Sequence, residues 1–198
     1  MSISAQEVKE LRDRSGVGMM DCKKALIEAN GDLDKAFEVL RKNGIAKAQK
    51  KAGRDAREGS IISYIHPGAK LGVLLELNCE TDFVANTNDF KDLANDICMH
   101  IAATAPISIK SEDVDSTLIE KEKEIYTDQA KQSGKPDEIV EKMVAGRLKK
   151  FLQENVLLEQ NFVKDPSKTI TDLITDKVSV LGENIVINSF SRFQIGEK

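Results

Sequence analysis

Apolar and polar residues alternate most regularly between residues 71 and 80, where every second side chain up to Cys79 is apolar. A period of two residues is typical of a β-strand with one buried face. A preceding run, Gly59–His66, has the same period but carries apolar residues on both faces, and Pro67-Gly68 between the two runs is a turn signal. We therefore predict two strands joined by a turn. The apolar face of the second strand comprises Leu71, Val73, Leu75, Leu77 and Cys79.

Helical spacing of apolar residues dominates residues 1–43 and predicts three short helices. Ser4 and Glu7 form a capping box at the start of the first helix. Asn30-Gly31 is a left-handed stop signal for the second helix, and Asp32 is a capping residue for the third. Helices of about a dozen residues are marginal in isolation, so we expect the three to pack together as a bundle.

The following stretch, residues 44–58, lacks this periodicity and predicts a linker. From Arg41 to Arg57 the chain has seven basic residues and one acidic residue, Asp55, which gives a local charge of +6 in a chain of net charge −4. A charge run of this kind is usually a solvated surface. The alternative is a contact surface for RNA or for an acidic partner.

Helical periodicity returns after residue 85. It predicts a helix that ends before Pro106, two long charged amphipathic helices between residues 111 and 153, and a further helix from Pro166-Ser167 to about Leu181. The break at Ser133–Pro136 makes the two long helices a helical hairpin. The apolar face of the helix that ends before Pro106 comprises Phe90, Leu93, Ala94, Ile97, Cys98 and Ile101.

The last predicted element is a strand, Ile185–Phe190, with apolar residues on both faces. The predicted fold class is therefore α+β. A three-helix bundle over residues 1–43 and a basic linker over residues 44–58 precede a core over residues 59–198. In this core, helices cover one face of an antiparallel sheet of roughly three strands.

Composition is that of a globular chain and limits its partners. Of its 198 residues, 40% are hydrophobic and 31% charged, and the negative net charge argues against nucleic acid as the default partner. Cys22, Cys79 and Cys98 show no C-x-x-C spacing, which indicates buried free thiols in a reducing compartment. No run approaches the roughly 18 apolar residues of a membrane helix, and Met1–Gln6 is unlike a signal peptide. We therefore expect a cytoplasmic protein.

Motifs of catalysis are missing from the sequence. Neither the phosphate loop G-x-x-x-x-G-K-[ST] nor the dinucleotide motif G-x-G-x-x-G occurs. The histidines are His66 and His100, and His100 follows Cys98 by two positions, where helical residues do not share a face. A zinc site from that pair fails on geometry. We therefore expect a protein that is not an enzyme and that holds neither a cofactor nor a metal.

Met19 and Met20 are candidates for partner binding. Adjacent helical positions point about 100° apart, so a narrow apolar stripe takes only one of the two side chains fully. The other must be at least partly exposed, where methionine makes an adaptable contact with a partner's apolar face. The alternative is that both methionines fill the open end of the bundle.

The connection Thr81–Ala85 is the second candidate, because a polar pair, Thr81-Asp82, is followed there by an apolar pair, Phe83-Val84. A large aromatic residue on so short a connection either packs under its own loop or enters another protein. In the first case Asp82 is a turn or capping residue. In the second case the loop is a binding element carried on a rigid scaffold.

At these residues the sequence resembles a known family. Ser15–Leu26 (SGVGMMDCKKAL) resembles the N-terminal signature of the bacterial translation elongation factor Ts family, and Asn78–Ala85 (NCETDFVA) resembles its second signature. Gln132–Met143 with Phe151, and the later Pro166–Thr169, also resemble that family. The likeness covers nearly the whole chain in the right order.

The resemblance implies a function in translation. The first three helices resemble a ubiquitin-associated-type bundle that docks on the nucleotide-binding domain of elongation factor Tu, with Met19, Met20 and Arg12 at the contact. The segment Thr81–Val84 is implied to insert near the partner's magnesium and phosphate site, with Phe83 as a wedge. The implied activity is guanine-nucleotide exchange: GDP leaves elongation factor Tu and GTP rebinds, without covalent chemistry.

One departure from the longer family members concerns the core. Those members carry two copies of the strand-and-helix core, whereas a single copy is found here, between Gly59 and the C-terminus. Short members of the family compensate by pairing two chains. We therefore expect a homodimer, with the strand Ile185–Phe190 as a plausible pairing surface.

Two other functions remain open. A ubiquitin- or peptide-binding adaptor would use the N-terminal bundle alone, and an RNA-binding protein would use the basic linker. Neither explains the Thr81–Val84 segment, and direct nucleic-acid binding is not expected.

Overall fold

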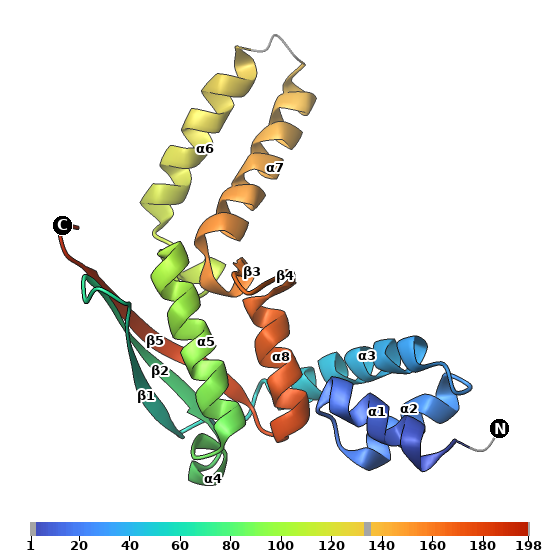
Figure 1. The fold of residues 1–198 in the computed structure, drawn as a ribbon. Coiled ribbons are helices and arrows are strands. Elements are labelled where there is room, and N and C mark those ends of the chain that lie inside the picture. The colour runs from blue at the N-terminus through green and yellow to red at the C-terminus, as the bar shows by residue number, and fades with distance from the viewer. Residues whose placement is uncertain (1–2, 133–135, 198) are drawn as a thin grey trace. The chain divides into compact units, whose positions relative to one another are not determined.

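A computed structural model describes residues 3–132 and 136–197 of the chain (Figure 1). The chain divides into two compact units, each built from three separate segments. Several helices and strands contain residues of both units. Unit 1 comprises Met1–Ile62, Leu75–Asn95 and Asp172–Asn188, and unit 2 comprises Ser63–Leu74, Asp96–Thr171 and Ser189–Lys198.

Unit 1 begins with the three helices that were predicted, α1 (Ala5–Ser15), α2 (Met19–Glu28) and α3 (Leu33–Lys51). The predicted capping box is confirmed: the Glu7 amide donates to Ser4 Oγ at 3.2 Å, and the Ser4 amide donates to the Glu7 carboxylate at 2.7 Å. The helices share one apolar core, which makes them a bundle. Its buried residues are Val8, Leu11, Val17, Cys22, Ala25, Leu26, Ala29, Ala36 and Leu40.

Helix α3 is longer than predicted. We expected the third helix to end before residue 44, whereas it continues to Lys51, so that prediction is wrong. Ala46 and Ala48 favour helix, and Gly44, which costs about 1 kcal/mol in a helix interior, has a packing role. A Cβ atom at Gly44 would lie 3.2 Å from Ser179 Oγ, so glycine permits a close approach there. The division into a docking bundle and a core stays a prediction.

The basic strip Arg41–Arg57 makes contacts within unit 1. Four of its residues, Arg41, Lys47, Lys51 and Arg54, contact other parts of that unit, so the strip is not simply a solvated linker. The contacts are Arg41 to Asp172 at 3.8 Å, Lys47 to Asp21 at 2.6 Å, Lys51 to the Gly182 carbonyl, Arg54 to Glu80 at 3.3 Å and Arg57 to Asp55 at 2.8 Å.

The predicted antiparallel three-stranded sheet is present, and the fold is α+β. Its strands are β1 (Glu58–Ile65), β2 (Leu71–Cys79) and β5 (Ile185–Gln194), in the order β1-β2-β5. The strands approach closely at Gly59, which has φ +143° and where a Cβ atom would lie 2.2 Å from the Leu77 carbonyl oxygen. Of the apolar face that the alternation predicted for β2, Val73, Leu75, Leu77 and Cys79 are buried, and Leu71 at the start of the strand is half-buried.

Two helices follow β2. The predicted connection Thr81–Ala85 contains the one-turn helix α4 (Asp82–Ala85), and α5 (Asn88–Thr104) is the predicted amphipathic helix. Thr87 caps α5, because its hydroxyl accepts the Phe90 amide at 3.2 Å. All six predicted apolar-face residues of α5, from Phe90 to Ile101, are buried.

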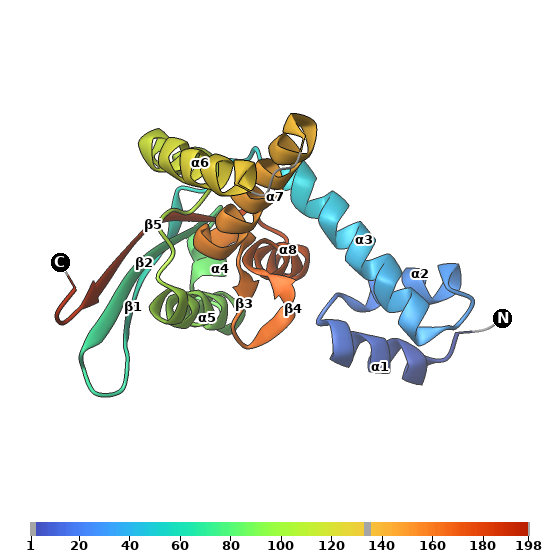
Figure 2. The same cartoon turned by 90° about the horizontal axis from the view of Figure 1, so that it is seen from above.

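Unit 2 contains the predicted helical hairpin, α6 (Ser116–Lys131) and α7 (Asp137–Asn155). The two helices lie side by side in both views (Figures 1 and 2). The predicted break includes residues 133–135, which lie outside the described residues. The buried side chains that join the hairpin are Ala130, Val140 and Val144.

A small antiparallel pair of strands in unit 2 was not predicted. It consists of β3 (Asn161–Phe162) and β4 (Asp165–Thr169), and short 3₁₀ helices occupy Ser111–Asp113 and Leu157–Glu159. Pro166 and Ser167 belong to β4, so the helix predicted from this point begins later, as α8 (Ile170–Leu181). Strands of two and five residues are too short to give a periodic signal.

Candidate partner-binding site

Thr81 initiates helix α4. Its side-chain oxygen accepts the Val84 amide at 3.4 Å, and its carbonyl accepts the Ala85 amide at 3.3 Å. At the other end of the turn, the Asn86 side-chain amide donates to the Asp82 carbonyl at 2.9 Å. Ala85 is buried, so the turn is anchored from below while its middle faces outward.

Phe83 is the most exposed large hydrophobic residue described, with 82% of its surface accessible. Its neighbour Asp82 is also exposed, whereas Val84 is half-buried and helps to anchor the turn. The alternative in which Phe83 packs under its own loop is therefore wrong. Phenylalanine is usually buried, and a ring held in solvent on an anchored turn is available to another molecule.

The Thr81–Val84 segment is held by a carboxylate from a distant part of unit 1. Glu183 Oε2 accepts the backbone amides of Glu80 at 3.1 Å and Thr81 at 3.0 Å, and Glu183 Oε1 accepts the Thr81 hydroxyl at 2.7 Å. Sequence reasoning did not find Glu183, because it lies 102 residues from Thr81. The only local signal was the turn-like sequence Gly182-Glu183-Asn184 before the last strand.

A second carboxylate, that of Glu80, makes the reciprocal contact: Glu183 accepts the backbone amide of Glu80, and Glu80 accepts the backbone amide of the residue after Glu183. It accepts the Asn184 backbone amide at 2.7 Å and an Arg54 guanidinium hydrogen at 3.3 Å. The Asn184 amide foremost, and then Arg54, lower the pKa of Glu80 below its usual value. Glu80 therefore stays ionised at neutral pH and keeps both contacts.

The bundle presents the other predicted group. Met19 and Met20 stand at the start of α2 with exposed fractions of 42% and 67%, and Arg12 on α1 is exposed as well. The prediction that at least one methionine is exposed is confirmed, and neither is buried as filler. Ile27 is also exposed and lies seven residues after Met20, on the same helical face. Sequence reasoning missed Ile27, although this spacing was visible.

Comparison with known proteins places these features in one family. A family model described as "Elongation factor TS" matches residues 32–197, which is most of the chain and includes the Thr81–Val84 segment. The chain belongs to the elongation factor Ts family. It is thus a translation elongation factor with a role in protein biosynthesis.

Individual elongation factor Ts proteins match over all or nearly all of their length. The protein of Fervidobacterium nodosum is 60% identical over 197 residues, which is 100% of both chains. That of Caldanaerobacter subterraneus subsp. tengcongensis is 57% identical over 195 residues, 98% of each chain. That of Thermosipho melanesiensis is 57% identical over 195 residues, 98% of this chain and 100% of the relative.

Within residues 3–132 and 136–197, every helix is too short or too polar to cross a lipid bilayer.

Proposed function

We propose that this chain binds elongation factor Tu in its GDP-bound form and promotes GDP release, after which GTP rebinds. The observation that supports this most directly is the exposed Phe83 ring on an anchored turn. In the proposal, the segment Thr81–Val84 enters the partner near its magnesium and phosphate site. The chain displaces contacts to the ion and the phosphates, and it makes or breaks no covalent bond.

The exchange activity is a coupling between two binding events. If the chain weakens GDP binding, GDP must weaken binding of the chain by the same factor. The chain must therefore prefer the empty partner to the GDP-bound one, since equal affinity for both shifts nothing. Burial of one phenylalanine contributes about 1.5–3 kcal/mol, which corresponds to roughly ten- to a hundredfold in an equilibrium.

A single ring is too little to release a tightly held nucleotide, so docking must contribute. We propose that the N-terminal bundle, of ubiquitin-associated type, docks on the nucleotide-binding domain through Arg12, Met19 and Met20. Exposed methionine adapts its shape to a partner's apolar surface. The bundle then supplies binding energy. Part of this energy compensates for the magnesium and phosphate contacts that Asp82 and Phe83 displace in the partner.

The direct test is a nucleotide-release assay. Elongation factor Tu is loaded with a fluorescent GDP, mixed with excess unlabelled nucleotide in a stopped-flow instrument, and followed with and without this chain. The expected result is a release rate that rises with chain concentration and then saturates. A rate independent of the chain would rule out the exchange function.

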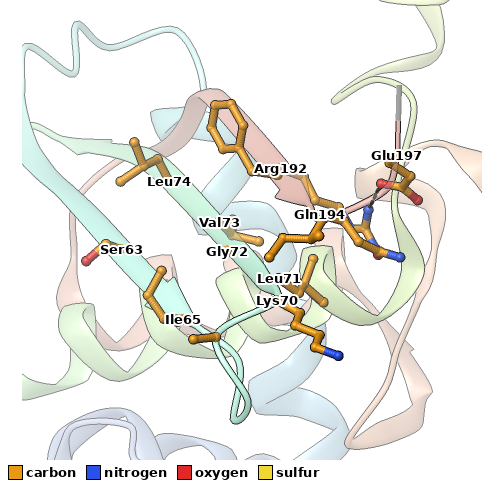
Figure 3. A pocket seen from close by; sticks show the side chains of 13 residues that line it. Ser63, Ile65, Lys70, Leu71, Gly72, Val73, Leu74, Arg192, Gln194 and Glu197 are labelled. Atoms are coloured by element: carbon orange, nitrogen blue, oxygen red, sulfur yellow. Dashed lines mark hydrogen bonds and ion pairs between the residues drawn. The ribbon is translucent and has the colours of Figure 1, made fainter.

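We also propose that the chain is a homodimer that pairs through the outer face of its sheet in unit 2. Figure 3 shows the pocket that strands of this sheet line, with Ile65 on β1, Leu74 on β2, and Arg192 on β5 paired with Glu197. The exposed apolar side chains of this region are Ile65, Leu74, Phe193 and Ile195. An exposed apolar cluster on a sheet face suits a second sheet, which would stack on it face to face.

A two-fold pair would bring the same apolar side chains of both copies together. Arg192 and Glu197, which also line this region, form an ion pair with each other within the chain. The apolar side chains are therefore the groups that would supply the contact. The strand region first expected to pair, Ile185–Phe190, is less suitable, because Ile185 and Ile187 are buried in the chain's own core.

A further inference from the structure

We propose that Glu183 is a positioning residue for the exchange segment: its carboxylate sets the shape of Thr81–Val84 and thereby the direction in which Phe83 projects. This inference rests on the proposed exchange function. It goes further by assigning a role to a residue that does not contact the partner in the proposal and that no sequence signature singles out.

The first support is the geometry of the carboxylate. Both oxygens of Glu183 are directed at the residues that immediately precede α4, and together they accept two backbone amides and one hydroxyl. Hydrogen bonds to a charged acceptor are stronger than neutral ones. Glu183 therefore fixes the backbone at Glu80 and Thr81, where strand β2 ends and the turn begins.

The second support is the double use of the Thr81 hydroxyl. It donates to Glu183 Oε1 at 2.7 Å, and the same oxygen accepts the Val84 amide at 3.4 Å. The bond to Glu183 thus holds Thr81 in the side-chain orientation that caps α4. A helix of a single turn has no stability of its own, so the placement of Phe83 depends on this cap.

The third support is that Glu183 is itself held in place. Gly182 has φ +78°, a left-handed conformation that glycine adopts without strain, and its carbonyl accepts the Lys51 ammonium. On the other side, the Asn184 backbone amide donates to Glu80 and its side-chain amide donates to the Arg54 carbonyl at 2.9 Å. The turn Gly182–Asn184 therefore joins the end of α3 to the exchange segment.

The test uses the full chain and two readouts. Stopped-flow release of fluorescent GDP from elongation factor Tu gives the maximal release rate and the chain concentration at half-maximal rate. Hydrogen exchange of the free chain gives the protection of the amides of residues 80–84. The variants are Glu183→Ala, Glu183→Gln and Thr81→Val, and the matched control is Glu141→Ala, which removes an exposed glutamate on α7.

Glu183→Ala is expected to lower the maximal release rate about tenfold, since it removes all three charge-assisted bonds, and to speed exchange of the Glu80 and Thr81 amides. Glu183→Gln should stay within about twofold of wild type, because its amide oxygen still accepts both backbone amides and its amino group can donate to Thr81. Thr81→Val should fall between them. Glu141→Ala should match wild type.

The outcomes separate the two proposals. If the wild-type chain does not accelerate GDP release, the exchange function fails, and the hydrogen-exchange readout still decides whether Glu183 orders the segment. If wild type is active and Glu183→Ala has the same maximal rate, the positioning role is overturned. A mere loss of folded protein raises the half-saturating concentration and leaves the maximal rate unchanged, which would also overturn it. Should Glu183→Ala fail to fold, Thr81→Val decides: a maximal rate equal to that of wild type overturns the positioning role, and a lower rate with faster exchange of the Val84 amide supports it.

Discussion

At the scale of single residues, Phe83 separates stability from function. Phe83 packs little against the chain's own core, because 82% of the residue's surface is accessible. Ala85, which is buried, and Val84, which is half-buried, anchor the turn beneath it. Removal of an exposed side chain usually changes the free energy of unfolding by less than about 0.5 kcal/mol. The effect of a change at Phe83 should therefore appear in partner function alone.

Phe83→Ala is expected to slow GDP release from elongation factor Tu by roughly ten- to a hundredfold, since burial of one phenylalanine is worth about 1.5–3 kcal/mol. Stopped-flow fluorescence measures the rate, and thermal unfolding should show an unchanged midpoint. Ile125→Ala, at an exposed position on α6, is the matched control. An unchanged release rate for Phe83→Ala would remove the wedge from the mechanism.

His100 is the second residue with a clear consequence. The Val163 amide can only donate, so His100 Nδ1 accepts it at 3.4 Å, and Nε2 must then carry the proton and donate to Gln160 Oε1 at 2.9 Å. The imidazole is fully buried and neutral in this arrangement. Burial lowers the pKa of His100, and the Gln160 contact offsets this only in part.

This lowered pKa predicts that acid destabilises the fold. Because the unfolded chain binds a proton at His100 near its usual pKa of about 6.5 and the folded chain binds it only at lower pH, stability is complete above that value. It is lost as the pH falls towards the folded-state pKa. Urea unfolding at pH 7.5 and 5.5 should show the decrease, and it should persist in His66→Gln, which removes the exposed histidine. NMR titration of the His100 ring at or above pH 6.5 would contradict this prediction.

At the scale of elements, the sequence predicted those helices and strands in which apolar residues recur at a regular spacing. The alternation of β2 and the apolar face of α5 were correct because each element buries one face, and burial selects side chains at a regular spacing. The end of α3 was predicted too early. Glycine usually disfavours a helix interior, whereas Gly44 lies inside α3, where its small size permits a close contact with Ser179. The candidate segment Thr81–Val84 was found from its local sequence pattern. Glu183 could not be found in this way, because it contacts residues that are distant in the sequence.

Helix α2 is the element on which docking is proposed to depend, so a charge on its exposed face should weaken association. Met20→Asp places an ionised carboxylate in an apolar contact and is expected to reduce affinity for nucleotide-free elongation factor Tu at least about tenfold. Titration calorimetry measures this, with Ile125→Asp on α6 as the control. Equal affinities for wild type and Met20→Asp would exclude α2 from the interface.

At the scale of the whole molecule, the sheet is the feature shared by both units. Strands β1, β2 and β5 each begin in one unit and end in the other. Their unit 2 ends carry exposed apolar side chains, whereas the unit 1 ends of β2 and β5 carry the buried residues Leu77 and Ile187. In the proposed dimer, the exposed apolar side chains of unit 2 would form the pairing surface.

Phe193→Asp should separate the proposed dimer into single chains, because the new charge would be buried against the second sheet without a partner. Sedimentation equilibrium should give about twice 21.9 kDa for wild type and 21.9 kDa for the variant. The control Ile125→Asp should behave as wild type. A wild-type mass of 21.9 kDa at micromolar concentration would show that the sheet face does not pair chains.

The contact between Glu183 and Thr81 also sets an order of events during biosynthesis. A ribosome adds about 5–20 residues per second, so the 102 residues between these two positions take roughly 5–20 seconds to make. Until then the turn at Phe83 lacks the carboxylate that holds it in the finished chain. Under the proposed function, a product that ended before Glu183 would bind elongation factor Tu through its N-terminal bundle without releasing GDP, and would compete with the full chain.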